Sequence, residues 1–530
     1  MKPIVYALVS FALGLDAFGF ASAQAQVDSE TWNRMRSEAR HRPRKLIVDN
    51  DGNDAMSMTE RTEQNFLAQR TSGLANTSVQ SLFYCANATF GMSTRSSSVW
   101  QERNWKDERV EITKGYNVQE LKEVGLDSLK MVCEFAKRNG IEVFTSIRMN
   151  DVHDHSPNTY GPAFFRNNHF KNQHPNWLLS TADKKSKTAA WSAVDYTIPE
   201  VREHLFRYVE EATKNYDLDG VSLDFFRHPA FFKTTFRGKP TTDQERAEMT
   251  ALVQRIRQHL DRVGMERARP ILLSIRVPDS LDYCRAIGLD VETWLENQWI
   301  DLILVSGYFQ LNDWGYSEKL GRRFNVPVYA SLDEPRVKDA EGLALRKDDA
   351  TYRGRVSAVL DAGLDGAALF NFFDPHSPLM HQLGKPEELA RHSQRWFAAA
   401  RSPVNANGGN LPYASFQTFE TLNPDHPKNL APNVPIAANI RLPKKRDSDY
   451  RHLRIRLSRP IPVDDLEVRF GTKLLSQGKT DGVWVQWDIS DQNASGLIEV
   501  QVIYRPKKLE SPMPKLQWKD LYVESSSDRP

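Results

Sequence analysis

The sequence predicts an α/β fold, a (β/α)8 TIM barrel followed by a C-terminal antiparallel β-sandwich. Between residues 44 and 370, short apolar runs alternate with polar loops and amphipathic helices, and eight such units follow one another. Beyond residue 435 the apolar spacing changes to a period of two, which is typical of antiparallel strands. The fourth apolar run ends on Asp224, and barrel enzymes carry their catalytic groups at such strand ends.

The first residues are typical of a secretory signal. Lys2 supplies positive charge, residues 4–21 form an apolar run, and two small-x-small patterns within residues 21–25 fit a cleavage site. Asp16 interrupts the run, which is also short for a membrane span. We therefore expect residues 1–25 to be removed and the mature protein to be exported, to the periplasm or outside the cell.

The amino-acid composition is that of an ordinary globular protein. The 530 residues are 40% hydrophobic and 26% charged, and their number allows a large barrel and a smaller second domain. The net charge of +2 gives no reason to expect a nucleic acid or a membrane surface as partner. Cys85, Cys133 and Cys284 are widely spaced and odd in number, so they predict neither a disulfide framework nor a metal cluster.

The eight predicted barrel strands share a short apolar run that ends in polar residues. Between them, segments such as residues 118–138 and the helix that opens at Pro199 show the apolar spacing of helices. A doubly wound open sheet is the alternative, but no glycine-rich phosphate loop follows the first strand. The predicted strands are residues 45–48, 79–84, 141–147, 221–223, 270–277, 300–305, 326–332 and 366–370.

An internal similarity supports the barrel. Residues 218–226 (LDGVSLDFF) resemble residues 364–373 (LDGAALFNFF), with one residue inserted in the second segment. By strand order these segments hold the fourth and eighth strands, which lie opposite each other in an eight-stranded barrel.

The composition changes again after the barrel. Proline, asparagine and glycine become frequent from residue 402, which is typical of a linker, and four alternating runs follow, at residues 453–457, 466–470, 483–487 and 498–502. The predicted organisation is therefore a signal peptide at 1–25, a barrel at 26–401, a linker at 402–435, a β-sandwich at 436–524 and a disordered tail at 525–530.

The segment around the fourth strand, residues 216–229 (YDLDGVSLDFFRHP), is the most informative in the chain. A strand buried on both faces is apolar throughout, so a carboxylate at its tip is costly unless it faces a polar cavity. Asp224 is therefore a catalytic candidate. The alternative is an aspartate that caps a helix or pairs with Arg227.

Four motifs in sequence order resemble a known family. From about residue 44 to 400 the chain is similar to the glycosyl hydrolase-like family 10 domain, found in exported barrel proteins placed among the glycoside hydrolases. The resemblance implies a TIM barrel that acts on carbohydrate, with Asp224 at a shared catalytic position, and it does not identify the sugar. The motifs are Arg-Met-Asn-Asp at 148–151, Pro-Asn-Trp-Leu-Leu at 175–179, residues 191–196 with Pro-Glu-Val-Arg from 199, and Asp-Gly-(x)3-Asp-Phe-(x)-Arg-His-Pro at 219–229.

A more distant similarity connects the fourth strand to α-amylase barrels, which carry an aspartate nucleophile there. That family has an arginine two residues before the aspartate, and this chain has Ser222. The difference argues against ordinary α-glucan chemistry.

Cleavage of a glycosidic bond generally requires two carboxyl groups, a proton donor and a nucleophile or base. Asp224 is the predicted nucleophile, with its ionised form favoured by Arg148, Arg227 or Arg276 if they reach it. We prefer Glu334 as the acid, because the adjacent Asp333 would raise one of the two pKa values.

Asp279 is the other candidate for the acid. It follows the fifth strand, which supplies the acid in amylase-like barrels, and it equally fits a helix cap before Leu281.

Other polar and aromatic groups near the strand ends suit a polyol substrate. The arginines and His228 among them suggest a cationic cleft, which favours an anionic or sulfated polysaccharide. The predicted substrate-binding residues are Asp49, Asp51, Asn87, Arg148, Asn150, Asp151, His153, Trp177, Trp191, Arg227, His228, Arg276, Tyr308, Asp333 and Asn371.

A calcium loop at residues 49–60 is a weaker possibility. Acidic and polar residues fall at the ligand positions, but Asp54 occupies the position that requires glycine, and the segment follows a strand. We therefore predict no metal and no cofactor, and Asp49 and Asp51 more plausibly line the barrel mouth.

The resulting interpretation is a secreted glycoside hydrolase that acts on a polysaccharide or oligosaccharide. The alternative is a non-catalytic carbohydrate-binding protein on a TIM-barrel scaffold. A serine esterase is disfavoured because the chain has no Gly-x-Ser-x-Gly elbow.

Overall fold

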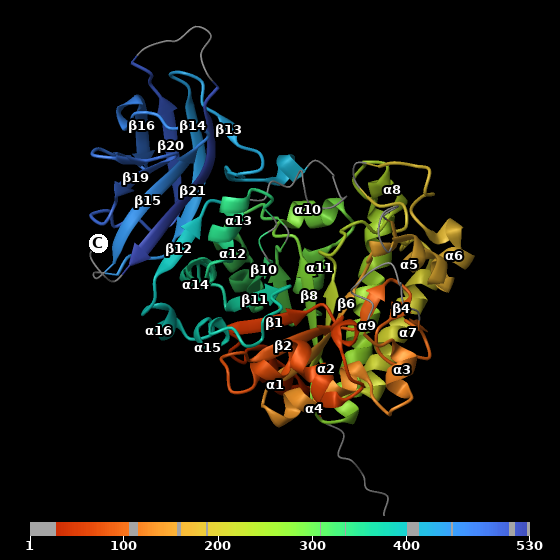
Figure 1. The fold of residues 1–530 in the computed structure, drawn as a ribbon. Coiled ribbons are helices and arrows are strands. Elements are labelled where there is room, and N and C mark those ends of the chain that lie inside the picture. Colours follow the sequence, from red (N-terminus) through yellow and green to blue (C-terminus); the bar gives the residue numbers. More distant parts are fainter. Residues whose placement is uncertain are drawn as a thin grey trace, which may run out of the picture.

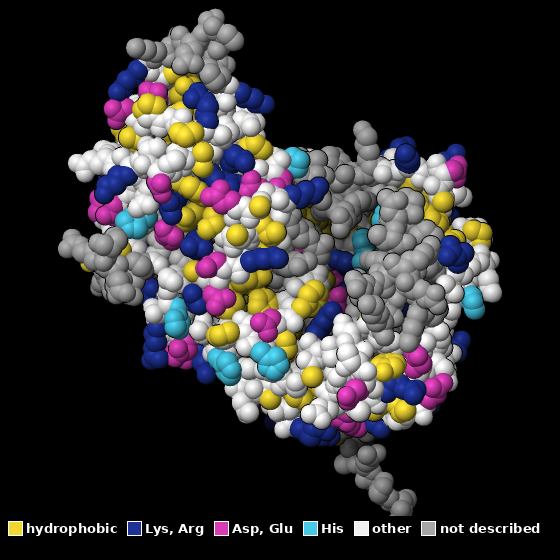
Figure 2. Space-filling model, viewed as in Figure 1, with side chains coloured by type: hydrophobic (Ala, Val, Ile, Leu, Met, Phe, Trp, Pro, Cys, Tyr) yellow, Lys and Arg dark blue, Asp and Glu magenta, His cyan; other side chains and the backbone are white. Residues whose placement is uncertain are grey.

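The structure, a computed structural model, consists of a barrel and a C-terminal β part that lie side by side (Figure 1). Among the described residues, no helix is both long enough and apolar enough to cross a bilayer. Figure 2 shows Lys and Arg interspersed with Asp and Glu over this face, in agreement with the small net charge. The structure describes residues 28–104, 115–155, 161–186, 189–307, 309–333, 335, 337–399, 413–446, 449–507 and 515–526.

Eight parallel strands close into a barrel, which confirms the predicted TIM-type fold. Each strand pairs in parallel with its two neighbours, and the order around the barrel is β1-β11-β10-β9-β8-β7-β6-β2. The strands are β1 (Leu46–Asn50), β2 (Ser81–Cys85), β6 (Glu142–Arg148), β7 (Gly220–Asp224), β8 (Leu272–Val277), β9 (Leu302–Val305), β10 (Val328–Asp333) and β11 (Gly366–Phe370).

Helices surround this barrel, and short elements fill its connections (Figure 1). The helix predicted at Pro199 begins at that residue, and α9 begins with a capping box between Thr242 and Glu245. The longer helices are α1 (Ser29–Arg40), α2 (Glu63–Arg70), α4 (Ser128–Arg138), α7 (Pro199–Asn215), α9 (Asp243–Glu266), α12 (Trp314–Phe324), α13 (Ala340–Lys347) and α14 (Asp349–Asp361). The shorter ones are α3 (Val118–Lys122), α5 (Gly161–Asn167), α6 (His169–Gln173), α8 (Lys233–Phe236), α10 (Leu281–Ala286), α11 (Val291–Glu296), α15 (Leu379–Gln382) and α16 (Pro386–Leu389), beside a small sheet of β3 (Asn87–Thr89), β4 (Met92–Ser93) and β5 (Gln101–Glu102).

The lumen is filled in layers, because side chains of one strand alternate between the lumen and the helices. At the bottom, Phe144 is in register with Gly220, and its ring stacks on Phe83 at 4.4 Å. A Cβ on Gly220 would lie 2.0 Å from the Phe144 ring, so this position requires glycine. Two residues further along each strand, three serines are in register, Ser146, Ser222 and Ser274.

The next layer is charged and closes the barrel at its C-terminal end. Arg148, Asp224 and Arg276 are in register on β6, β7 and β8. The layers below are packed and apolar at their base, so the lumen is a core rather than a pore.

The internal sequence similarity has a structural reason. Asp219 and Asp365 precede β7 and β11, and each accepts a hydrogen bond from the backbone N–H of a residue near the start of a neighbouring strand, Val143 at 2.9 Å and Val328 at 2.8 Å. The two strands lie opposite each other in the barrel, as predicted. The repeated Asp-Gly therefore serves strand pairing at the base.

The C-terminal part contains two antiparallel sheets, which confirms the predicted antiparallel β region. Both sheets contribute to one buried cluster, with Ile440 and Val502 from one and Ile455 and Val523 from the other. One sheet is formed by β12 (Gln394–Phe397), β13 (Lys428–Asn429), β15 (Tyr450–Leu457), β18 (Lys479–Asp481), β19 (Trp484–Asp488) and β21 (Gln517–Ser526), and the other by β14 (Pro435–Leu442), β16 (Leu466–Phe470), β17 (Lys473–Leu474) and β20 (Gly496–Tyr504).

One strand of this region precedes the predicted linker. β12 pairs with β21 and packs against α14 of the barrel, so the C-terminal sheet begins before residue 402. The composition change marks the connection after β12 rather than the start of the sheet.

Buried ion pairs join the two parts. Arg346 of α13 donates to both carboxylate oxygens of Asp520 on β21, each at 2.7 Å, and both side chains are almost fully buried. Arg456 of β15 pairs with Asp339 at 2.6 Å and with Glu341 at 2.7 Å. The charges around α13 therefore connect the barrel to the C-terminal sheet.

We expect Arg346→Met to lower the free energy of unfolding by about 3–5 kcal/mol, because it leaves the Asp520 carboxylate buried without its partner. The double variant Arg346→Met/Asp520→Leu should recover much of this loss. Urea denaturation of the three proteins measures both effects. Arg391→Met, which removes an exposed pair with Glu388, should change stability by about 0–1 kcal/mol. Equal losses at Arg346 and Arg391 would contradict this account.

Candidate active site

A buried guanidinium, that of Arg276, is at the centre of the barrel mouth. Its Nη1 lies 3.3 Å from Oδ2 of Asp224 and 3.7 Å from Oδ2 of Asp49. Its guanidinium carbon also lies 3.9 Å from the centre of the Phe370 ring, a cation–π contact. β1 and β8 are not neighbours in the sheet, so Arg276 connects carboxylates from separate parts of the barrel rim.

Asp224 is held by both of its carboxylate oxygens. Oδ1 accepts hydrogen bonds from the backbone N–H groups of Phe226 and Arg227, both at 2.9 Å, while Oδ2 faces Arg276. The backbone of Arg227, and not its guanidinium, makes this contact with Asp224. The carboxylate is therefore fixed in orientation at the tip of β7.

Asp49 lies on the other side of Arg276 and is buried at the end of β1. Burial raises the pKa of Asp49 to about 7, the charge of Arg276 opposes this rise, and the charge of Asp224 adds to it. A carboxyl group with this pKa is partly protonated at neutral pH, as a general acid must be.

The shared contact with Arg276 also limits the distance between the two acids. Since the Oδ2 atoms of Asp224 and Asp49 lie 3.3 and 3.7 Å from the same nitrogen, they are at most about 7 Å apart. This limit allows the separation of about 5–5.5 Å found in retaining glycosidases and the shortest separations, from about 6.5 Å, found in inverting ones.

A second charged network borders this centre, formed by Asp151, Arg148, His153 and Arg227. Asp151 accepts from Arg148 Nη1 at 3.1 Å and from His153 Nδ1 at 2.6 Å, and Arg227 Nη2 donates to His153 Nε2 at 2.8 Å. Although burial opposes it, contact with His153 and Arg148 holds the pKa of Asp151 well below its usual range. Burial lowers the pKa of His153, so this ring is a neutral bridge between Asp151 and Arg227.

His228 and Asn371 stand at the rim in left-handed backbone conformations, with φ of 60° and 57°. The His228 ring lies edge-on to His153 with centroids 5.3 Å apart, and burial together with Arg227 holds its pKa well below the usual range. The buried amide oxygen of Asn371 accepts no hydrogen bond from the residues that the structure describes. Strained polar residues of this kind are frequent in binding sites.

The side chains of three predicted site residues form hydrogen bonds with backbone groups. Asn87 bonds both backbone groups of Arg148, and Asn150 bonds Val194 and Ala230. Asp279 accepts from the N–H groups that follow Gln310, at 2.9–3.0 Å. Burial raises its pKa to about 7. These contacts explain Asp279 as the anchor of the connection after β9, and its role as the acid stays a prediction.

The remaining predicted residues that the structure describes lie around the mouth or in its connections. Asp51 pairs with Arg70 of α2, and Asp333 ends β10. Trp177 stacks on His174 at 3.7 Å, and Trp191 packs against Phe165, both in the long connection between β6 and α7. Glu334 and Tyr308 lie outside the described residues, and so does the loop at 156–160.

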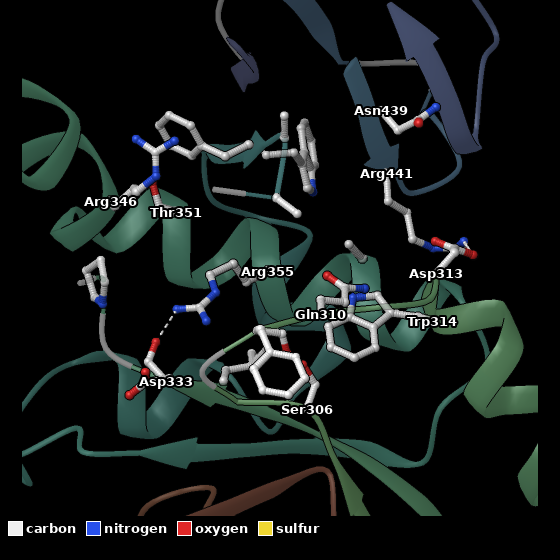
Figure 3. A pocket seen from close by; sticks show the side chains of 18 of the residues that line it. Ser306, Gln310, Asp313, Trp314, Asp333, Arg346, Thr351, Arg355, Asn439 and Arg441 are labelled. Carbon is white, nitrogen blue, oxygen red and sulfur yellow. Dashed lines mark hydrogen bonds and ion pairs between the residues drawn. The ribbon is translucent and has the colours of Figure 1, made fainter. Parts of the chain in front are cut away.

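A cavity of about 200 Å³ opens beside the mouth, between the barrel and the C-terminal part (Figure 3). It shares Ser306 and Asp333 with the strand ends and extends to Arg441 on β14. Arg355 of α14 points into it. Sequence reasoning missed Arg355, because an arginine on an amphipathic helix is typical of a solvent-facing position.

No described group of three or more His, Cys, Asp or Glu side chains is arranged to hold a metal ion. The three cysteines are buried and free. The titratable groups that the structure describes at the mouth are carboxylates, guanidinium groups and imidazoles.

Comparisons with known proteins agree with the predicted family. Residues 97–313 match the family model of glycosyl hydrolase-like 10, and this range includes β6 to β9 with Arg148, Asp224 and Arg276. No curated protein matches the sequence.

The solved structures similar to this chain include the following three enzymes. A cycloisomaltooligosaccharide glucanotransferase of Paenibacillus sp. has 9% identity and a TM-score of 0.33, over 91% of this chain and 57% of that one. An α-amylase of Geobacillus thermoleovorans has 10% identity and a TM-score of 0.35, over 89% and 99%. The chitinase ChiW of Paenibacillus has 12% identity and a TM-score of 0.37, over 87% and 52%. Since these TM-scores are low, the barrel is established by its own strand pairing and not by these similarities.

Proposed function

We propose that this chain is a glycoside hydrolase that cleaves glycosidic bonds of a polysaccharide with two carboxyl groups, Asp224 and Asp49. The observation that carries the proposal is the contact of both carboxylates with one buried guanidinium, Arg276, at the C-terminal end of the barrel. The match to the glycosyl hydrolase-like 10 model supports the same class of reaction.

The environments of the two acids favour different roles. Asp224 accepts two backbone hydrogen bonds and faces Arg276, contacts that stabilise a carboxylate and orient it for attack or for activation of water. Burial raises the pKa of Asp49 to about 7, which suits proton donation to the leaving oxygen. Glu334 and Asp279 stay alternative acids.

Arg276 has a positioning role in this proposal. Its charge limits how far burial raises the pKa of Asp49, and its contact with Oδ2 of Asp224 helps to fix the orientation of that carboxylate. Asn371, His228 and Arg227 at the rim can hydrogen-bond sugar hydroxyl groups.

The second candidate function is a carbohydrate-binding protein without catalysis. It is favoured by the extent to which the acids at the mouth are paired, since Arg70 holds Asp51, and Arg148 and His153 hold Asp151. Under this alternative, Asp49 and Asp224 would serve only to neutralise Arg276.

We also propose that the protein is exported, from the signal-like residues 1–25. N-terminal sequencing of the protein from a periplasmic or culture fraction tests this. A mature terminus close to residue 26 would support export, and an intact first segment in the cytoplasmic fraction would contradict it.

Asp224→Asn is expected to reduce the release of reducing ends by about 10³-fold or more, since the amide retains the shape of the carboxylate but neither attacks nor accepts a proton. The assay compares neutral, uronic and sulfated polysaccharides. Asp219→Asn is the matched control, because Asp219 lies at the opposite end of the same strand and should leave turnover unchanged. Equal binding by wild type and Asp224→Asn, with no reducing ends from either, would favour the binding protein.

The rate of wild type should fall as pH rises above about 7, because Asp49 must be protonated to donate its proton. Asp49→Asn should be slower and should lose this alkaline limb of the kcat/KM profile. The control is Asp54→Asn, which removes another buried acid with a raised pKa, about 6, bonded to Asn50 and Tyr84. If the limb persists in Asp49→Asn, another group such as Glu334 is the acid.

A further inference from the structure

The cavity beside the barrel mouth has the features of a binding subsite. Residues of both parts line it, with Ser306 and Asp333 from the barrel and Asn439, Arg441 and Leu497 from the C-terminal part. Figure 3 shows the side chain of Arg355 in its interior, above the end of β10 that carries Asp333. A ligand in the cavity would therefore lie directly beside the ends of β9 and β10.

The walls are mostly apolar and aromatic, and Phe309, Trp314, Trp396 and Phe419 are among them. Apolar walls with a few fixed polar groups are typical of small-molecule sites. The volume of about 200 Å³ is below the roughly 300–1,000 Å³ of sites for drug-sized ligands, so it suits one sugar ring rather than a chain.

The three arginines of the lining differ in their partners. Arg346 donates to both oxygens of Asp520, and Arg441 forms an ion pair with Asp313. Arg355 forms no ion pair with any described carboxylate, and its one hydrogen bond goes from Nη1 to the backbone carbonyl of Asp333 at 2.9 Å. The remaining N–H groups of its guanidinium are therefore available to a ligand.

The electrostatic environment of Arg355 favours an incoming anion. Burial lowers the pKa of Arg355. Tyr352, whose ring centre lies 5.8 Å from the guanidinium carbon, and Asp333 oppose this effect, and the charge of Arg346 adds to it. The hydrogen bond that Arg355 donates goes to the backbone carbonyl of Asp333 and not to its carboxylate. The guanidinium of Arg355 is half-buried, and a bidentate oxyanion would stabilise it.

By contrast, two arginines of the mouth already pair with carboxylates. Arg148 pairs with Asp151, and Arg276 lies between Asp49 and Asp224. Preference for an anionic substrate therefore has a firmer basis at Arg355 than at Arg148 or Arg276.

We propose that this cavity binds an anionic sugar unit, with the carboxylate or sulfate group of that unit held by Arg355. The proposal deepens the proposed function, because it assigns the substrate class and gives the C-terminal part a share in recognition. Carboxylate and sulfate present the same pair of oxygens to the planar fork of an arginine.

Ligand-detected NMR titration of the full mature protein with D-glucuronate, D-glucose 6-sulfate and D-glucose tests the proposal. We expect at least one anionic sugar to bind at least tenfold more tightly than D-glucose. Arg355→Met should weaken that binding at least tenfold, and Arg355→Lys should weaken it less. Binding of glucuronate alone would identify a carboxylate ligand, and binding of the sulfated sugar alone a sulfate ester.

The matched control is Arg353→Met on the same helix, whose guanidinium contacts Ser393 and Gln382 and does not line the cavity. If Arg355→Met fails to fold, Leu497→Trp at the exposed edge of the cavity gives the second test, since the larger ring should block the site. Anionic sugars that bind no better than D-glucose, or that bind equally to Arg355→Met or Leu497→Trp, would overturn the proposal. Binding is measured without turnover, so its outcome is separate from that of the Asp224→Asn assay.

Discussion

The pairing of Arg276 with Asp49 and Asp224 is the interaction on which the barrel mouth depends. A guanidinium buried this deeply is tolerated only with charged partners in good geometry, and each carboxylate is in turn tolerated because Arg276 is there. The three groups come from β1, β7 and β8, so this contact also fixes how the rim of the barrel closes. The charge environment of the two acids and the closure of the barrel rim therefore depend on the same pair of contacts with Arg276.

The charged layer of Arg148, Asp224 and Arg276 rests on uncharged layers that fill the lumen below it. Phe144 fills the space that Gly220 leaves, and the serines above provide a small polar layer before the arginines and Asp224. These packed layers close the lumen below the carboxylates. The C-terminal sheets are attached beside that face through α13, and they complete the cavity that contains Arg355.

Much of the fold can be predicted from sequence, because each barrel strand is a short apolar run with a polar end. The same rule identified Asp224, Asp49 and Arg276 as residues of the mouth. The rule could not single out Asp49 as a candidate proton donor, because the raised pKa of Asp49 depends on its burial and on charges from strands distant in sequence. Nor could the sequence predict that the carboxylate of Asp279 accepts hydrogen bonds from backbone N–H groups more than thirty residues away. β12 was missed because its four residues precede the change in composition that marks the linker.

The most direct test of this arrangement is the titration of the Asp49 carboxyl group by carbon-13 NMR in the folded protein. The burial of Asp49 and its contact with Arg276 predict an apparent pKa near 7, and a higher value in Arg276→Met, because the guanidinium stabilises the ionised form. A pKa near 4, the ordinary value for aspartate, with no response to Arg276→Met, would contradict the coupling of Asp49 to Arg276 and with it the assignment of Asp49 as the acid.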